Sequence, residues 1–392
     1  DPGYTEKEDF ESGTKAAAAG GFTLVFDMPN TDPPTISLDA LDRKREIAER
    51  RAVVDFCLYA GCGLDMLDGL PSLAKAGVVA FKLWTTEVPQ KGLSATDEAS
   101  IRRVMAEVSK AKGLLCVHAE DQAIINRETE RLMREGRRDP LAYAEARPNE
   151  AEASSVALLI RLCQEFNVHV HFVHISTREA VSILREAKAR CTVTAETCPQ
   201  FLLLTKDVMK GLGPYAKLSP PLRSRADNEA LWSSIEEGIV ETIGSDHAPH
   251  LKEEKELGWS DIWKAPSGAS SIEFVVPLLL TKVNQGFIPL SRLVKCMSEN
   301  VAKIYGLYPR KGVIKEGSDA DLTIVDLKER FRLRTDKMYS KDRYSVLYDG
   351  WEAQGRVVAT LVRGEVVMKD GEVLAKPGYG RFVQPYRYPS QL

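Results

Sequence analysis

The chain has 392 residues, which is long enough for one barrel-sized domain with an appendage or for two to three smaller domains. Its net charge of -3 at pH 7 gives no reason to expect a nucleic acid or an anionic membrane surface as a partner. No run approaches the roughly 20 apolar residues needed to span a bilayer. The 7 cysteines include no Cys-x-x-Cys pair, which favours reduced thiols and a cytoplasmic protein.

Short apolar runs alternate with longer amphipathic stretches over the first two thirds of the chain. This alternation is typical of βαβ units with a parallel sheet. The predicted strands are 22–28, 53–59, 78–83, 114–117, 168–173, 192–195 and 239–243, and helices are predicted over 37–50, 97–112, 150–166 and 178–190. So many strands within about 250 residues predict an α/β fold of the (β/α)8 barrel type. The rival, an open doubly wound sheet, usually carries a Gly-rich phosphate loop, which the sequence lacks.

The pattern changes near residue 308. Short alternating runs punctuated by glycine and aspartate occur at 312–317, 321–326 and 357–367. They predict short strands rather than further barrel units. We therefore expect a barrel over 1–307 and a small C-terminal β-sheet appendage over 308–392.

Four polar residues close predicted strands: Lys82, His118, His174 and Asp246. Because reacting groups in a barrel lie at the C-terminal ends of the strands, these side chains could meet at one rim and form a metal site. A lysine in an apolar run can lose its charge through burial, and its neutral amine can add carbon dioxide to form a carbamate that bridges two metal ions. Taken singly, the histidines also suit structural hydrogen bonding, and Asp246 suits a helix cap.

His169 and His171 form a His-x-His pair, but the spacing argues against metal binding. At roughly 3.3 Å per residue, His169 lies about 16 Å from His174 along an extended strand. Strand alternation also turns both side chains away from the face of His174. We predict that these two histidines have a packing role.

Several motifs resemble those of the dihydroorotases, and the resemblance runs along the whole chain. They are DPGYTEKEDFESGT at 1–14, DMPNTDPPT at 27–35, VHAE at 117–120, VHIS at 173–176, PPLRS at 220–224, SDHAPH at 245–250 and GSDADL at 317–322. The resemblance implies a zinc-dependent enzyme that reversibly cyclises N-carbamoyl-L-aspartate to dihydroorotate in pyrimidine biosynthesis.

The resemblance also implies roles for the metal-site residues. A carboxylated Lys82 would bridge two zinc ions, and His118 and His174 would bind the second of them. Asp246 would bind the first zinc and act as general acid and base. Glu196 matches a glutamate that binds an additional zinc in some relatives.

Substrate contacts follow from the same resemblance. Asn30 would hydrogen-bond the substrate, His250 would contact its carboxylate or ring, and the loop containing Gly268 would supply backbone contacts. Ser219 occupies a position where relatives often have asparagine, and the 268–273 loop also departs from their pattern. Both departures leave the substrate preference open.

Two expectations concern the segment before Asp1. Dihydroorotases carry a His-x-His-x-Arg motif immediately upstream, so we expect a truncated sequence that lacks the first barrel strand and the N-terminal part of the appendage. We also expect a protein that starts at Asp1 to be inactive or badly impaired, because it would lack two zinc ligands and a substrate arginine.

Other interpretations stay open. An allantoinase or hydantoinase shares the barrel and the metal site, and the Glu-Thr-Cys-Pro sequence at 196–199 favours it. A non-catalytic subunit that associates with aspartate carbamoyltransferase is a second alternative, and a homo-oligomer is possible. The charged segment 251–263 suits a mobile lid or a solvated helix equally.

Overall fold

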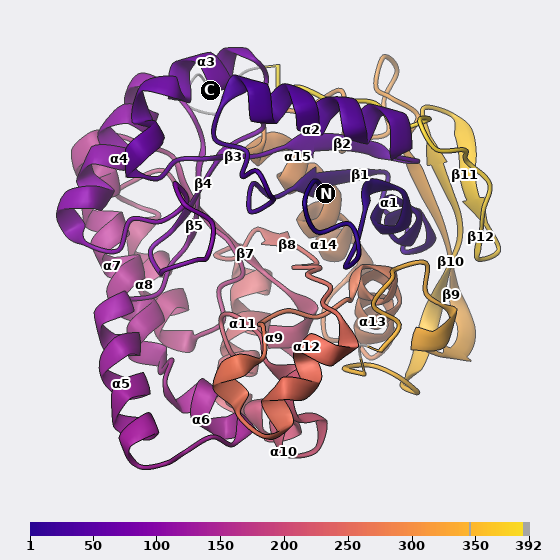
Figure 1. The fold of residues 1–392 in the computed structure, drawn as a ribbon. Coiled ribbons are helices and arrows are strands. Elements are labelled where there is room, and N and C mark those ends of the chain that lie inside the picture. The colour runs from indigo at the N-terminus through magenta and orange to yellow at the C-terminus, as the bar shows by residue number, and fades with distance from the viewer. Residues whose placement is uncertain (345, 387–392) are drawn as a thin grey trace.

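A computed structural model describes residues 1–344 and 346–386 of the chain. Its parallel strands form the inner layer of an α/β barrel (Figure 1). One ladder joins β1 (Leu24–Asp27) to β2 (Asp55–Leu58). A six-stranded sheet then follows chain order from β3 (Ala60–Gly61) through β4 (Phe81–Trp84), β5 (Leu115–His118), β6 (Val170–Phe172) and β7 (Val193–Thr197) to β8 (Thr242–Ile243). Each predicted strand of the barrel is thus confirmed.

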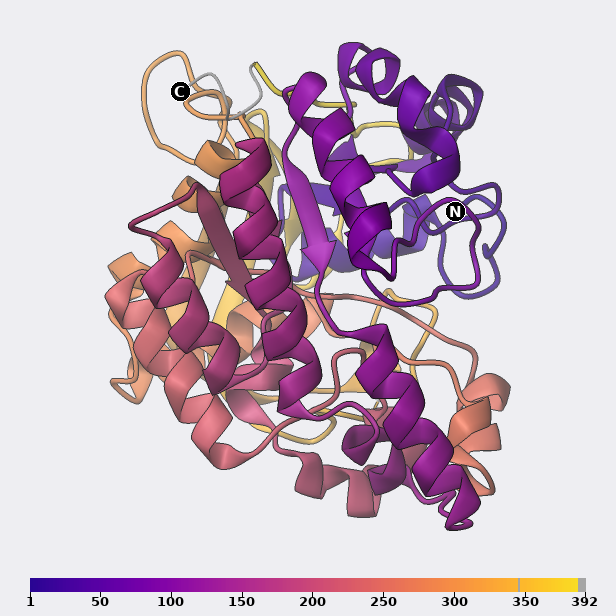
Figure 2. The same ribbon diagram turned by 90° about the vertical axis from the view of Figure 1, so that its left-hand side faces the viewer.

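The predicted helices lie outside these strands, as Figure 2 shows for the left side of Figure 1. They are α2 (Leu38–Arg51), α4 (Glu98–Lys110), α7 (Asn149–Phe166) and α8 (Arg178–Ala187). Three of them begin where a side-chain oxygen accepts a backbone N–H of the first turn, from Ser37, Asp97 or Thr177. β2 and β5 are buried along their whole length, as expected for parallel strands that are covered on both faces.

The remaining helices connect these units or cover the ends of the barrel. They are α1 (Phe10–Ala19), α3 (Leu70–Lys75), α5 (Gln122–Arg134), α6 (Pro140–Glu145), α9 (Pro199–Leu203), α10 (Met209–Leu212), α11 (Arg225–Glu237), α12 (Lys252–Glu256), α13 (Ile272–Asn284), α14 (Leu290–Val294) and α15 (Asn300–Ile304). Within the described ranges, no helix combines the length and the apolar character that crossing a bilayer requires.

The C-terminal part contains an antiparallel sheet in the order β12-β11-β10-β9. Its strands are β9 (Leu322–Arg332), β10 (Glu352–Val362), β11 (Glu365–Lys369) and β12 (Glu372–Val373), at the right of Figure 1. The strand predicted over 312–317 was wrong, because Gly312 and Gly317 adopt φ values of +83° and +86° and make turns. The other two runs lie in β9, β10 and β11.

The C-terminal sheet shares its hydrophobic core with the barrel. Val357 and Val362 of β10 belong to the same cluster of buried side chains as Phe56 of β2 and Leu279 of α13. The boundary between 307 and 308 therefore stays a prediction. Residues 345 and 387–392 of the expected appendage lie outside the described residues.

Candidate active site

The two predicted histidine ligands are in direct contact. His118 is the last residue of β5, and His174 follows the end of β6 with a φ of +44°. Nδ1 of His118 lies 3.2 Å from Nε2 of His174. Two nitrogens that each lie about 2.05 Å from one tetrahedral zinc ion are separated by about 3.3 Å. The observed spacing therefore suits two ligands of a single metal ion.

Burial disfavours the protonated form of both histidines, and metal binding requires the neutral imidazole. Burial lowers the pKa of His118 to about 4, although its hydrogen bond to Glu120 acts in the opposite direction. Burial and the neighbouring His118 hold the pKa of His174 well below its usual range. Each imidazole thus keeps a lone pair available for a cation.

Lys82 is buried beside these histidines. It is 2% exposed and occupies the second position of β4, so the expectation that it ends the strand was wrong. β4 continues to Trp84, and the Lys82 ammonium lies 4.2 Å from the centre of the indole ring. Burial lowers the pKa of Lys82 to about 7, against the opposing influence of Cys116 and Asp246. A substantial fraction of this amine is therefore uncharged at neutral pH.

Asp246 and Glu196 are the predicted carboxylates of the site. Asp246 follows β8 with a φ of +48°, and Gln200 donates a hydrogen bond of 3.4 Å to its Oδ2. Glu196 lies in β7, and its carboxylate packs against Gly244, so that a Cβ added to this glycine would lie 2.6 Å from Cδ of Glu196. Burial raises the pKa of both carboxyl groups to about 7, and the charge of Asp246 raises that of Glu196 further.

The electrostatic interactions of Lys82 connect the members of the predicted site. Its charge lowers the pKa of Asp246 and Glu196 and of the two histidines. β4 to β8 are parallel, so these residues gather at one end of the sheet. The structure thus brings the five predicted metal-site residues to one region, where Lys82, His118 and His174 are buried and Glu196 and Asp246 are half-buried. His118 and His174 are in direct contact there.

A separate acidic cluster has a structural character. Within residues 1–344 and 346–386, one group of three His, Cys, Asp or Glu side chains has its possible ligand atoms within 4.8 Å of one another. It consists of Asp55, Asp319 and Asp321. Nζ of Lys311 lies between them, 2.7 Å from Asp55 and 3.0 Å from Asp319, and it also contacts Asp321. Because a lysine already balances this cluster, we do not assign a metal to it.

Among the predicted substrate residues, His250 and Gly268 are neighbours. Nε2 of His250 donates to the backbone oxygen of Ser267 at 3.0 Å. Gly268 has a φ of +145°, and a Cβ added there would lie 3.0 Å from Cδ2 of His250. Asn30 is exposed and Ser219 is half-buried. The contacts of all four with substrate stay predictions.

Two buried lysines hold the loop that contains Gly268. Nζ of Lys217 donates to the carbonyl oxygens of Ile262 and Ala265, the first at 2.8 Å. Nζ of Lys255 donates to those of Pro266 and Gly268 at 3.1 and 2.8 Å. Lys255 belongs to α12, so the segment 251–263 turns one of its charges inward, and a lid movement stays a prediction.

Sequence reasoning missed Glu120, Arg147 and Gln200. Glu120 accepts a hydrogen bond of 2.8 Å from Nε2 of His118, and Arg147 forms an ion pair with Glu120. Glu120 stands in the VHAE motif, two residues after His118, so this spacing was an available signal. Arg147 and Gln200 come from other segments, and only the tertiary structure places them near the site. His169 and His171 instead share the hydroxyl of Thr194, at 3.0 and 2.8 Å.

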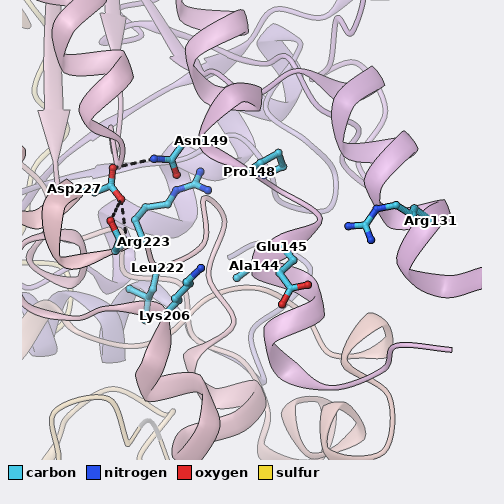
Figure 3. Close-up of a pocket in the computed structure, with 10 residues that line it drawn as sticks. Arg131, Ala144, Glu145, Pro148, Asn149, Lys206, Leu222, Arg223 and Asp227 are labelled. Carbon is cyan, nitrogen blue, oxygen red and sulfur yellow. Dashed lines mark hydrogen bonds between the residues drawn. The ribbon is translucent and has the colours of Figure 1, made fainter. Parts of the chain in front are cut away.

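The surface of the described residues contains a cavity of about 430 Å³. Its lining includes Arg131, Asn149, Lys206, Arg223 and Asp227, and none of the predicted site residues. Figure 3 shows Arg223 and Lys206 on one side of the cavity and Arg131 on the other. The cavity is therefore distinct from the buried Lys82 neighbourhood.

Comparison with known proteins identifies the family. The model of the amidohydrolase family matches residues 1–367. The L-hydantoinase of Paenarthrobacter aurescens is 37% identical over 97% of this chain and 83% of its own length. The dihydroorotase of Methanothermobacter thermautotrophicus is 39% identical over 98% of this chain and 84% of its own length. A solved structure of L-hydantoinase (dihydropyrimidinase) from Arthrobacter aurescens superposes with a TM-score of 0.95 at 36% identity, covering 98% of this chain and 86% of that one. The chain therefore belongs to the amidohydrolase family, among its cyclic amidohydrolases.

Proposed function

We propose that the protein hydrolyses the ring amide of a hydantoin-type cyclic ureide and uses two zinc ions for this purpose. The observation that carries the proposal is the buried Lys82, whose pKa is lowered to about 7 within a neighbourhood of histidine and carboxylate side chains. A buried lysine that forms no ion pair with one particular carboxylate is a candidate for chemical modification, such as carboxylation of its neutral amine.

The residues present fit zinc in type and spacing. Imidazole nitrogen and carboxylate oxygen are ordinary zinc ligands, and the 3.2 Å between the His118 and His174 nitrogens matches two ligands of one ion. Nδ1 of His174 has no hydrogen-bond partner among the described residues, although it is buried. In our proposal, Lys82, His118, His174 and Asp246 hold the metal, and Glu196 has a supporting role.

Lys82 would enter the site as a carbamate. The lone pair of the neutral amine attacks the carbon of CO2, an N–C bond forms, and the nitrogen releases a proton. The product carries a carboxylate that can offer one oxygen to each of two cations. Because the pKa of Lys82 is lowered to about 7, this reaction needs no strong base at neutral pH.

Asp246 would move the proton during hydrolysis. When bound, zinc supplies a water acidic enough to attack at neutral pH and a positive charge beside the ring carbonyl. A carboxylate oxygen of Asp246 would take the water's proton as the water oxygen bonds to the carbonyl carbon. Asp246 would then pass this proton to the ring nitrogen as the C–N bond breaks. Gln200 holds Oδ2 of Asp246 in place through its 3.4 Å hydrogen bond.

The match to L-hydantoinase favours a hydantoin over dihydroorotate as the substrate. The relative with that name is 37% identical to this chain, and a solved structure of L-hydantoinase superposes on it with a TM-score of 0.95.

Dihydroorotase is the second candidate. It is supported by the 39% identity to a dihydroorotase and by the motifs at 27–35 and 245–250. Association with aspartate carbamoyltransferase and homo-oligomer formation remain predictions.

The decisive test is a substrate comparison. The zinc-loaded protein is assayed on hydantoin, 5-substituted hydantoins of both hands, allantoin and dihydroorotate. We expect kcat/KM to be at least tenfold higher for a hydantoin than for dihydroorotate. The reverse order would establish a dihydroorotase. A folded, zinc-loaded protein that turns over none of them would support the non-catalytic interpretation.

Asp246→Asn provides the matched control for this assay, because it keeps the size of the side chain and removes its basic oxygen. We expect it to lower kcat at least 100-fold, in the range of general acid–base catalysis. A variant that keeps wild-type turnover would remove Asp246 from the proposed mechanism.

A further inference from the structure

A buried cluster of charged side chains lies directly behind the histidine pair. Glu120 is 0% exposed and accepts the 2.8 Å hydrogen bond from Nε2 of His118. Nε of Arg147 lies 3.2 Å from both oxygens of the same carboxylate. Nη2 of Arg223 lies 3.7 Å from Oε1. One carboxylate thus faces one imidazole and two guanidinium groups.

The hydrogen bonds of Glu120 determine which nitrogen of His118 is free. The guanidinium group of Arg147 has donors only, and it faces both oxygens of the carboxylate. Both oxygens of Glu120 therefore accept, so the 2.8 Å hydrogen bond runs from Nε2 of His118 to Oε2 of Glu120. The lone pair then lies on Nδ1, the nitrogen that is 3.2 Å from His174.

Arg223 connects this arrangement to the second histidine. Its Nε donates to Oγ of Ser176 at 3.0 Å, and its Nη1 donates to the backbone oxygen of Arg147. Ser176 follows His174 by two residues, as Glu120 follows His118. The backbone N–H of Ser176 is in turn held at 2.9 Å by the buried Glu152. The turns that follow the two histidines are therefore joined through one guanidinium group.

We propose that Glu120, held by Arg147 and Arg223, is a positioning residue that sets the tautomer of His118 and fixes its spacing from His174 before any metal binds. The inference rests on the proposed metal site and deepens it. Arg147 and Arg223 present donors to Glu120, which accepts from Nε2 of His118 and so leaves Nδ1 of His118 free. Arg223 contacts the turns after both histidines and so fixes their separation. The spacing between His118 and His174 is therefore set before a metal binds.

The tautomer is directly measurable in the protein without metal. Long-range ¹H–¹⁵N spectra of ¹⁵N-histidine-labelled protein at pH 8 distinguish the two forms of each ring, and the His118→Asn spectrum assigns the signals. We expect His118 of the wild type to carry its proton on Nε2. In Glu120→Gln the amide has one acceptor oxygen in place of two, so it cannot accept from the imidazole and from both guanidinium groups. We therefore expect a mixture of the Nε2-protonated and Nδ1-protonated forms of His118 in this variant.

Zinc affinity is the second measurement, made with zinc alone in competition with a chelator. We expect Glu120→Gln to weaken zinc binding 10- to 100-fold, in the range typical of lost outer-shell partners of a ligating histidine. Glu241→Gln is the control, because the carboxylate of Glu241 accepts from Lys188 and from the backbone N–H of Ala195, and not from either histidine of the pair. We expect its affinity to stay within twofold of the wild type.

The outcomes distinguish the proposed metal site from the positioning role of Glu120. A wild type that binds no zinc would contradict the proposed metal site. A wild type that binds zinc, with an unchanged tautomer and affinity in Glu120→Gln, would overturn the positioning role alone. If Glu120→Gln does not fold, Glu120→Asp gives the same reading, because the shorter side chain withdraws its carboxylate by about 1.5 Å. An unchanged tautomer and affinity in that variant would equally overturn the role.

Discussion

Lys82 and His118 illustrate what burial does to single residues in this protein. Lys82 is 2% exposed, its ammonium lies 4.2 Å from the centre of the Trp84 ring, and burial lowers its pKa to about 7. His118 is buried as well, and its pKa falls to about 4. In both cases the low-polarity interior disfavours the charged form. Each side chain therefore offers a lone pair at neutral pH, which is the condition for carbamate formation and for metal binding.

The rate of carboxylation of Lys82 should follow its lowered pKa. Only the neutral amine reacts, so the rate of carbamate formation at fixed CO2 should rise about tenfold per pH unit below pH 7 and level off above about pH 8. The measurement is the growth of the ¹³C carbamate signal of the metal-free protein under ¹³CO2. Lys82→Met, which cannot form the carbamate, is the blank. A rate that keeps rising to pH 10 would show an ordinary lysine.

Gly244 should be required for the position of Glu196. A Cβ at residue 244 would lie 2.6 Å from the carboxyl carbon of Glu196, and the end of that side chain can move away. We therefore expect Gly244→Ala to change the free energy of unfolding by less than about 1 kcal/mol while lowering kcat at least tenfold. Gly211→Ala is the control, since no atom lies within 4 Å of its added Cβ. Equal activity of the two variants would contradict a role for Glu196.

At the scale of elements, strands carry Lys82, His118 and Glu196, and the short loops after the strands carry His174 and Asp246. His174 and Asp246 follow β6 and β8 with φ values of +44° and +48°, which non-glycine residues rarely adopt. Lys217 and Lys255 of α12 hold the loop that contains Gly268 by donating hydrogen bonds to its carbonyl oxygens. Loops held in this way can place backbone groups beside a substrate.

Removal of the Lys255 ammonium should loosen this loop. In the wild type, Nζ of Lys255 donates to the carbonyl oxygens of Pro266 and Gly268 at 3.1 and 2.8 Å. Lys255→Met removes this donor. Because the loop is proposed to contact the substrate, we expect KM to rise about tenfold with a smaller change in kcat. Lys252→Met is the matched control on α12, where Lys252 is half-buried and pairs with Glu256. A similar KM in both variants would argue against the loop as a substrate contact.

At the scale of the whole molecule, a buried ionic cluster joins the barrel to the C-terminal part. Asp55 of β2 accepts from Nζ of Lys311 at 2.7 Å, from the guanidinium of Arg363 and from the backbone N–H of Arg381 at 3.0 Å. These partners come from three separate C-terminal segments. Together with the core that β10 shares with the barrel, they bind the two parts into one unit.

Asp55→Asn should therefore weaken the whole fold. Lys311 and Arg363 would lose a buried counter-charge, and breaking such a pair on one side costs about 3–5 kcal/mol of unfolding free energy. Chemical denaturation monitored by circular dichroism measures this loss. The exposed pair of Arg334 and Asp336 is the control, and Asp336→Asn should leave the unfolding midpoint unchanged. A small effect of Asp55→Asn would mean that the hydrophobic contacts alone hold the C-terminal part.

The local sequence determined the strands, the helices and most of the residues that meet in the site. Apolar runs and capped amphipathic stretches specify the βα order, because burial and helix capping act over a few residues. The positions of Lys82, His118, His174 and Asp246 followed from the same runs. The prediction of a strand over 312–317 failed because glycines with positive φ make turns there.

The tertiary structure alone decided which side chains support the site. Arg147, Arg223 and Gln200 come from segments far from the residues they contact, so their spacing in the sequence does not reveal these contacts. The lowered pKa of Lys82 and the 3.2 Å contact of His118 with His174 likewise need several strands to be packed together. Burial and ion pairing are properties of the assembled interior, so they arise only when distant segments exclude water from the same place.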